Sequence, residues 1–329
     1  MHPQSLQDAT KQNWRAFLET YEPLRTDLYR YCRYLTRSPW DAEDLSQDTL
    51  ARAFVTLAQM TVEPPNPRAW LFRVASNLWV DRKRSERAAE RATSNEPAGG
   101  AAAEPRDARE AAGTLLAKLG PQERAAVVLK DVFDFSLEEI AETLGSTTGG
   151  IKAALHRGRG KLGDERASEP ERAARPAALD AFCEAFNRGD IDGLTKLLLD
   201  TSTVVVVGAT TQYGPEAARR TVLRGMLHGT EVMADPNGFM DPSLTVGVLP
   251  VRPRLEARLH RGRWVLVHWY QHEGGEEWVR AFTLVEIEDG GVTRLANYFY
   301  TPEFIAELGA ELGVPVRVNG YRWCKKEAS

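Results

Sequence analysis

The residues with the clearest chemistry in this sequence are the basic side chains between residues 151 and 162. Cations of this kind neutralise phosphates, and short polar side chains at the start of a helix reach base edges. Ile151, Leu155 and Leu162 recur at helical spacing, so they form an apolar stripe while the cations lie elsewhere. No acidic residue interrupts the segment. The candidates for contacts with nucleic acid are Thr147, Thr148, Lys152, His156, Arg157, Arg159 and Lys161.

Two preceding helices must position this basic helix. Pro121 to Val132 and Ser136 to Leu144 carry apolar residues at helical spacing, Gly145 breaks the chain, and Thr147 or Thr148 can cap the third helix. This order predicts a helix-turn-helix, whose second helix enters the major groove of DNA. An ordinary solvated helix hairpin is the alternative.

Two glycines at the start of the basic helix, Gly149 and Gly150, are unusual for a reading helix. Each carries no side chain and weakens a helix by about 1 kcal/mol relative to alanine. Either the backbone approaches DNA closely there, or sequence reading depends on fewer groups.

A second set of aromatic and basic residues follows the proline-rich loop from Met60 to Pro67. In the expected helix from Arg68 to Arg87, Trp70, Arg73 and Asn77 recur at three- and four-residue spacing and so share one face. A basic cluster follows them at residues 82–84. An aromatic surface with nearby cations suits a separated nucleic-acid strand. At least one of Trp70 and Trp79 is expected in the core. The candidates are Trp70, Arg73, Asn77, Arg82, Lys83 and Arg84.

Two long motifs resemble a known family. WDAEDLSQDTLARAFVTL (40–57) and NPRAWLFRVASNLWVDRKRSER (66–87) resemble region 2 of a bacterial sigma factor. LLAKLGPQERAAVVLKDVFDFSLEEIAETLG (115–145) and IKAALHRGRGKL (151–162) resemble region 4. No regions 1 or 3 intervene, which is the layout of the extracytoplasmic function (ECF) group. The resemblance implies a promoter-recognition subunit of RNA polymerase without catalytic chemistry of its own.

The resemblance also implies a role for each set of residues. The basic helix would read the promoter's −35 element, and the helix from Arg68 would handle the −10 element. A carboxylate-rich face would dock on core RNA polymerase; its residues are Asp41, Glu43, Asp44, Gln47 and Asp48. Charge complementing a helix N-terminus is the alternative for Asp41 and Glu43, and it explains Gln47 and Asp48 less well.

Composition agrees with a soluble cytoplasmic protein of two or three domains. The chain has 329 residues, 43% hydrophobic, with a net charge of −4. Its cations are nevertheless clustered, in 82–91 and 152–161, as nucleic-acid binding requires. Cys32, Cys183 and Cys324 lack metal-binding spacing, and we expect no metal and no cofactor. No apolar run approaches the length of a membrane helix, and no signal-peptide core is present.

Composition shifts give the expected boundaries. Region 2 spans 1–95, a flexible linker spans 96–112, the helix-turn-helix spans 113–163, a second linker spans 164–175 and a further domain spans 176–329.

The last domain is expected to be α+β. A helix over 177–199, interrupted at Gly189 and Gly193, precedes strands at 204–207, 255–260, 264–271, 278–287 and 292–300, taken as antiparallel. LDAFCEAFNRGDIDGLTKLL and TRLANYFYTPEFIAEL resemble the SnoaL-like family, a curved sheet and helices around a conical pocket. We expect pocket-lining side chains among His268, Tyr270, Trp278, Asn297 and Tyr298.

Some SnoaL-like proteins are enzymes, which raises the question of catalysis. The acid/base candidates here are His260, His268, His272, Asp235, Asp241 and Glu256. A lone histidine on a strand is more often structural, and no paired carboxylate or metal spacing supports it. We therefore expect a ligand-sensing or protein-docking domain that regulates the sigma regions. The alternatives are a DNA-tethered SnoaL-like enzyme and a helix-turn-helix regulator that acts without polymerase.

Overall fold

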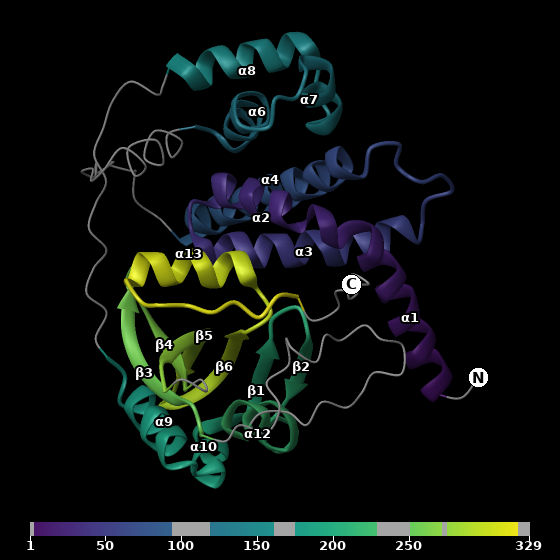
Figure 1. The fold of residues 1–329 in the computed structure, drawn as a ribbon. Helices are drawn as coiled ribbons and strands as arrows, with labels where there is room; N and C mark the ends of the chain where they lie inside the picture. The colour runs from purple at the N-terminus through teal and green to yellow at the C-terminus, as the bar shows by residue number, and fades with distance from the viewer. Residues whose placement is uncertain (1–2, 94–118, 161–174, 229–250, 272–274, 322–329) are drawn as a thin grey trace. The chain divides into compact units, whose positions relative to one another are not determined.

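The structure is a computed structural model, and it describes residues 3–93, 119–160, 175–228, 251–271 and 275–321. The chain divides into two compact units, Met1–Glu169 and Pro170–Ser329 (Figure 1). Both expected linkers fall almost entirely outside the described residues, so those boundaries stay predictions. No described helix is long and apolar enough to cross a membrane.

The first unit begins with four helices and a short 3₁₀ turn. They are α1 (Pro3–Tyr21), η1 (Glu22–Leu24), α2 (Arg25–Thr36), α3 (Pro39–Leu57) and α4 (Pro67–Thr93). Leu28, Tyr31 and Leu35 recur at three- and four-residue spacing in α2 and are fully buried. Tyr31 stacks on Phe72 of α4 with ring centroids 4.5 Å apart, which joins the second and fourth helices.

The three predicted helices of the helix-turn-helix are present. They are α6 (Pro121–Asp131), α7 (Leu137–Thr143) and α8 (Thr148–Gly160). Gly145 has φ +58° after α7, the left-handed conformation that favours glycine at the end of a helix. Ser136 and Glu139 form a reciprocal cap at the start of α7, in which each side chain accepts the other's backbone N–H.

The second unit combines helices with one six-stranded sheet, and the α+β expectation is confirmed. Its helices are α9 (Ala177–Arg188), α10 (Ile191–Leu197), α11 (Pro215–Ala218), the π-helical turn η3 (Arg219–Leu223), α12 (Arg224–His228) and α13 (Pro302–Leu312). Its strands are β1 (Leu198–Val206), β2 (Thr210–Tyr213), β3 (Arg254–His260), β4 (Arg263–Gln271), β5 (Glu277–Glu288) and β6 (Gly291–Tyr298). The strand order is β2-β1-β6-β5-β4-β3.

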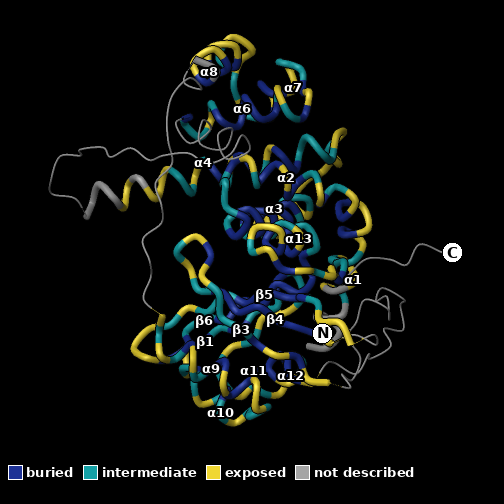
Figure 2. Tube along the Cα trace, turned by 60° about the vertical axis from the view of Figure 1, so that its left-hand side comes forward, coloured by how far each residue is buried: buried dark blue, intermediate teal, exposed yellow. Residues whose placement is uncertain are grey.

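The sheet is covered on both faces. Helix α13 lies over one face, and α9, α10 and α12 lie on the other (Figure 1). Strands β4 and β6 are therefore largely buried (Figure 2). Phe304 of α13 packs against Phe282 and Tyr298 on its face of the sheet. Leu255, Leu266 and Leu295 belong to the core under the other helices.

Two expectations about this unit are wrong. β1 pairs parallel to β6, because the chain between them is long enough to return in the same direction; the other strand pairs are antiparallel. The helix breaks at Gly189 as expected but not at Gly193, which lies inside α10. There the backbone N–H of Gly193 donates to Asp190 at 2.7 Å, and a Cβ would lie 2.4 Å from that carboxylate. Gly193 therefore allows a close cap.

Candidate nucleic-acid interface

Helix α8 has a tightly built N-terminus. The Thr147 hydroxyl accepts the backbone N–H of Gly150 at 3.0 Å, so Thr147 is the capping residue. A Cβ on Gly150 would lie only 2.7 Å from the Ser146 hydroxyl oxygen. A side chain at position 150 would therefore have to displace the Ser146 hydroxyl. A Cβ on Gly149 would meet its nearest neighbour, the Thr147 hydroxyl oxygen, at 3.9 Å, so the turn leaves room for a side chain there.

The two sides of α8 differ as the sequence predicts. Ile151 and Leu155 are buried against the supporting helices, while Lys152 and His156 are exposed. Gly158 brings α8 close to α6, since a Cβ there would lie 2.8 Å from Val127. Exposed and buried positions alternate along this helix (Figure 2).

The predicted −35 residues are not equally available. Arg157 donates to Glu123 of α6 at 2.9 Å, so its guanidinium already has a partner inside the helix-turn-helix. Glu123 also accepts the backbone N–H of Gly120 and so caps α6. Thr148 is exposed at the first position of α8. Lys161 and the side chain of Arg159 lie outside the described residues.

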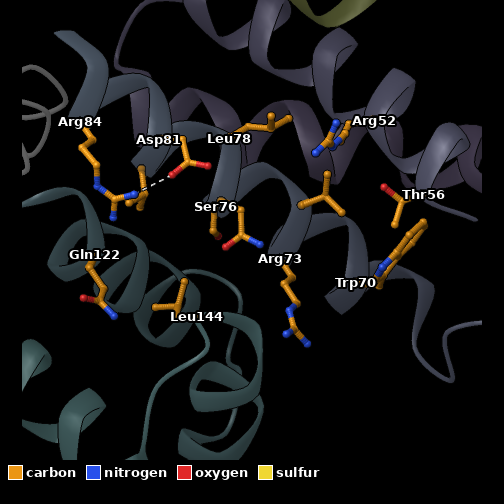
Figure 3. A pocket seen from close by; sticks show the side chains of 13 residues that line it. Arg52, Thr56, Trp70, Arg73, Ser76, Leu78, Asp81, Arg84, Gln122 and Leu144 are labelled. Carbon is orange, nitrogen blue, oxygen red and sulfur yellow. Dashed lines mark hydrogen bonds and ion pairs between the residues drawn. The ribbon is translucent and has the colours of Figure 1, made fainter. Parts of the chain in front are cut away.

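Helix α4 carries the predicted −10 residues on two sides. Asn66 caps it by accepting the backbone N–H of Ala69 at 3.0 Å. Trp79 is buried at 4% exposure and Trp70 is only half-buried, so Trp79 is the core tryptophan. Trp70, Arg73, Asn77 and Arg84 line one pocket (Figure 3). Arg82 and Lys83 do not line it.

The basic cluster of α4 is held by acidic neighbours. Arg82 donates to Asp48 of α3 at 2.7 Å, and Lys83 pairs with Glu86. The Lys83 ammonium also lies 4.7 Å from the ring centroid of Trp79. Arg84 donates to Asp81 at 3.0 Å.

The carboxylate-rich face of α3 divides into structural and surface residues. Ser38, rather than Asp41, caps this helix, because its hydroxyl accepts the backbone N–H of Asp41. Glu43 is 2% exposed and accepts from Arg25 at 3.1 Å and from Gln47 at 2.6 Å. Glu43 therefore forms a buried ion pair and is not part of an exposed docking face, contrary to the prediction from the sequence.

The remaining residues of that face are nearer the surface. Asp48 is exposed, and Asp41, Asp44 and Gln47 are half-buried. Their contact with polymerase stays a prediction.

Arg124 of α6 and the turn after α6 pack on the first helices of the same unit. The Arg124 guanidinium donates to the backbone oxygen of Leu35, and burial lowers the pKa of Arg124 to about 10. Phe133 lies 5.0 Å from Phe72, centroid to centroid. The guanidinium of Arg68 lies 5.4 Å from the ring centroid of Phe133. Sequence periodicity could not find these contacts, because they join helices far apart in the chain.

The second unit buries a row of polar side chains across three strands. His268 Nε2 lies 2.7 Å from the Thr283 hydroxyl, which accepts from Asn297 at 2.9 Å. His268 is fully buried beside Phe186, and its Nδ1 has no hydrogen-bond partner among the described residues. Burial lowers the pKa of His268 to about 3, so the ring is neutral near pH 7.

The predicted pocket residues lie on both faces of the sheet. Tyr270 is on the face of His268, in a small cluster with Phe299 and Tyr300. Trp278 pairs opposite Tyr270 and is half-buried. Tyr298 packs on Phe304 of α13, so it belongs to the opposite face. A pocket lined by His268, Tyr270, Trp278 and Asn297 stays a prediction, and Tyr298 is excluded from it because it packs on α13.

The other acid/base candidates are engaged or lie elsewhere. His260 lies 2.6 Å from Glu311, and Glu256 accepts from Arg258 and Trp269. His272, Asp235 and Asp241 lie outside the described residues, as does Cys324.

The structure adds buried polar residues that sequence reasoning missed. Thr283 and Asn319 are fully buried, and no motif marks either of them. Cys32 and Cys183 are buried thiols without a disulfide. Among the described residues, no group of three His, Cys, Asp or Glu side chains is placed to hold a metal ion.

Known protein families match the first unit. Sigma-70 region 2 matches residues 20–89, and Sigma-70 region 4 matches residues 109–162. The chain is 28% identical to the ECF RNA polymerase sigma factor SigG of Mycobacterium tuberculosis over 54% of this chain and 57% of that protein. It is 30% identical to the probable ECF RNA polymerase sigma factor SigI of the same species, over 58% of this chain and 72% of that protein.

The extent of these matches differs. This chain spans little more than half the length of SigG. It also resembles the crystal structure of the Mycobacterium tuberculosis ECF sigma factor SigJ, with 21% identity and a TM-score of 0.33 over 91% of this chain and 100% of that chain. A likeness this weak does not bear on function.

Proposed function

Because the chain belongs to the ECF RNA polymerase sigma factors, we propose that it binds core RNA polymerase and directs it to promoters. The observation that carries this proposal is the division of α8, which buries Ile151 and Leu155 and exposes Lys152 and His156. A reading helix needs both sides, since one must dock on the protein and the other must meet DNA.

The −35 element would be met by the N-terminal part of α8. Thr147 holds the first turn, and Thr148 and Lys152 are exposed beside it. Helix N-termini also favour phosphate through their free N–H groups. Arg157 can contribute to DNA binding only by leaving Glu123 or by bridging from it.

The −10 element would be met along α4. Trp70 offers an aromatic surface, and Arg73 and Asn77 follow at helical spacing. Arg82 and Lys83 supply charge for the phosphate backbone. The half-buried and exposed acidic residues of α3, Asp41, Asp44 and Asp48, would meet polymerase.

A reconstituted transcription assay tests this function. The chain is combined with core RNA polymerase and promoter DNA, and run-off transcript is measured against core alone. Transcription that starts only when the chain is present supports the proposal. Duplex binding without any association with core polymerase would instead support a stand-alone regulator.

The second unit would regulate the first in cis. It begins at Pro170, directly after the helix-turn-helix, so its local concentration near that unit is on the order of millimolar. A contact of about 1 to 3 kcal/mol would then change the active population 5- to 150-fold. Deletion of 176–329 should alter transcription without abolishing core binding, and we expect transcription to rise. Equal transcription by both forms would contradict regulation.

The enzyme alternative has one favourable observation, the neutral buried His268, whose Nδ1 has no partner among the described residues. Turnover of a small molecule by the full chain, lost in His268→Gln, would support it. If the second unit instead contacts the first unit or senses a ligand, no turnover is expected.

A further inference from the structure

The pocket beside α4 has walls from both helical parts of the first unit. Arg52 and Thr56 come from α3, and Arg73 and Asn77 come from α4. Gln122 of α6 and Leu144 after α7 close the other side, within the same unit (Figure 3). The cavity volume is about 580 Å³, within the range of about 300 to 1,000 Å³ typical of small-molecule sites.

The pocket has an excess of positive charge. Arg52, Arg73 and Arg84 line it, and among the described lining residues Asp81 alone carries a carboxylate. Asp81 is occupied by Arg84 at 3.0 Å. Neither Arg52 nor Arg73 has an ion-pair partner in the part of the chain that the structure describes. Guanidinium groups match the geometry of phosphate oxygens, so two such groups in one cavity favour a phosphate ligand.

The rest of the lining suits the base of a nucleotide. Trp70 stands at one end of the pocket and Gln122 lies toward the other (Figure 3). An indole ring supports stacking of any base, worth about 1 to 3 kcal/mol per base. Asn77 and Gln122 add amides that both donate and accept hydrogen bonds.

We propose that this pocket binds a free nucleoside polyphosphate. The base lies at the Trp70 end, and the phosphates run along α4 past Arg73 toward Arg84. The positive charge of the lining favours an anion, and the aromatic end favours a flat group that can stack on it. A nucleotide carries both.

Such a ligand would act as a bridge and as a competitor. It would contact α4 on one side and Gln122 on the other, so it would favour the arrangement in which α6 and α7 lie against α4. It would also occupy Trp70, Arg73 and Asn77, which are three of the proposed −10 contacts. This consequence, unlike binding itself, rests on the proposed function.

An extruded nucleotide of single-stranded DNA has the same chemistry, so the experiment compares the two sources. Equilibrium dialysis of the full chain without polymerase measures binding of ATP, adenosine, inorganic pyrophosphate and a short single-stranded oligonucleotide. We expect saturable ATP binding, with adenosine and pyrophosphate each at least about 10-fold weaker.

Variants connect the binding to the pocket. Arg73→Ala and Gln122→Glu should each raise the Kd for ATP by about 10-fold or more, since the first removes a phosphate contact and the second adds a repelling charge. Gln122 is exposed and lies outside the proposed DNA contacts, so Gln122→Glu tests the pocket without relying on them. Arg224→Ala, on an exposed residue of the second unit, is the matched control and should leave the Kd unchanged.

The outcomes separate this proposal from the proposed function. Arg82→Ala with Lys83→Ala should weaken promoter binding and leave ATP binding intact, because neither residue lines the pocket. No saturable ATP binding, ATP binding insensitive to both pocket variants, or pyrophosphate binding as tightly as ATP would overturn the nucleotide site. Binding of the oligonucleotide alone would also overturn it and would assign the pocket to DNA.

Discussion

Asp48 of α3 and Arg82 of α4 form an ion pair of 2.7 Å between the proposed polymerase-binding and DNA-binding surfaces. Asp48 is 60% exposed and Arg82 is 33% exposed. A pair this accessible to water contributes at most about 1 kcal/mol, because solvent screens it. Arg82 can therefore exchange this carboxylate for a phosphate at little cost.

Substitution of Arg82 and Lys83 together by alanine should weaken promoter binding almost equally across sequences. Phosphate contacts supply affinity without base information. The slope of the logarithm of the binding constant against the logarithm of the salt concentration should therefore become shallower by about one to two. Fluorescence anisotropy of the chain with core polymerase, on cognate and scrambled duplexes at several salt concentrations, measures both. Arg188→Ala, at an exposed arginine of the second unit, is the control. A loss confined to one base position would contradict the phosphate role.

Charge reversal on the α3 face should abolish association with core polymerase. Asp44→Arg with Asp48→Arg replaces two carboxylates by cations and creates repulsion where attraction is proposed. A fluorescence titration against core polymerase gives the affinity, and circular dichroism checks the fold. Glu184→Arg, at an exposed residue of the second unit, is the matched reversal. Unchanged affinity in the double variant would remove this face from the interface.

Glu43→Ala should act on stability instead of on the surface. It takes one carboxylate partner away from the buried Arg25 guanidinium, which keeps Glu22 as its other partner. The cost should therefore lie below the value of about 3 to 5 kcal/mol for a fully uncompensated buried charge, and above that of an exposed pair. Urea unfolding followed by circular dichroism measures the change. Asp48→Ala is the comparison and should shift stability by less than about 1 kcal/mol. Equal effects of the two substitutions would contradict the buried role of Glu43.

Periodicity in the sequence predicted the helices of the first unit well, because their buried faces repeat every three or four residues. It could not place Glu43, whose burial depends on Arg25 in another helix, 18 residues away. In the second unit, alternation along β4 places His268 and Trp269 on opposite faces of the sheet. Alternation likewise separates Asn297 from Tyr298 on β6, but it could not show which face α13 covers, because that depends on the packing of Phe304 on Tyr298. Long-range pairing is absent from local patterns.

Asn319→Ala should destabilise the second unit. Asn319 is fully buried, accepts from Arg280 Nε at 2.7 Å, and donates to the backbone oxygens of Arg280 and Phe299. Truncation leaves these groups unsatisfied, at a cost of about 1 to 3 kcal/mol. Thermal unfolding of the full chain measures it, with the exposed neighbour substitution Val318→Ala as control.

The segment before Asn319 also contacts the sheet, which affects truncation experiments. Val279 donates to Pro315 and accepts from Arg317, so residues 315–317 pair with β5. Deletion of 314–329 should therefore lower the melting temperature as well as alter transcription. If the deletion variant unfolds at the same temperature as the full chain, this segment contributes nothing to the fold. For the point variants, equal stability of Asn319→Ala and Val318→Ala would contradict the role of Asn319.

His268 should make the second unit less stable at acid pH. Burial lowers its folded-state pKa to about 3, whereas an unfolded histidine titrates near about 6.5. Above about pH 6.5 both states are neutral and His268 adds no pH dependence. Below it, the unfolded chain takes up a proton that the folded chain excludes. Stability then falls by up to about 1.4 kcal/mol per pH unit, until the folded state also protonates near pH 3.

His268→Gln should remove this contribution, because glutamine does not titrate in that range. Urea unfolding of the full chain between pH 4 and pH 7 gives the free energy of unfolding at each pH. This free energy should depend less steeply on pH in the variant than in the parent, because about one proton fewer is taken up on unfolding at the acid end. Leu266→Val, on the same strand and face, should lower stability equally at every pH and keep the parent's slope. If the slope of His268→Gln matches the parent's, His268 is not held neutral by burial, and the interior of this sheet admits water or a charge partner to the ring.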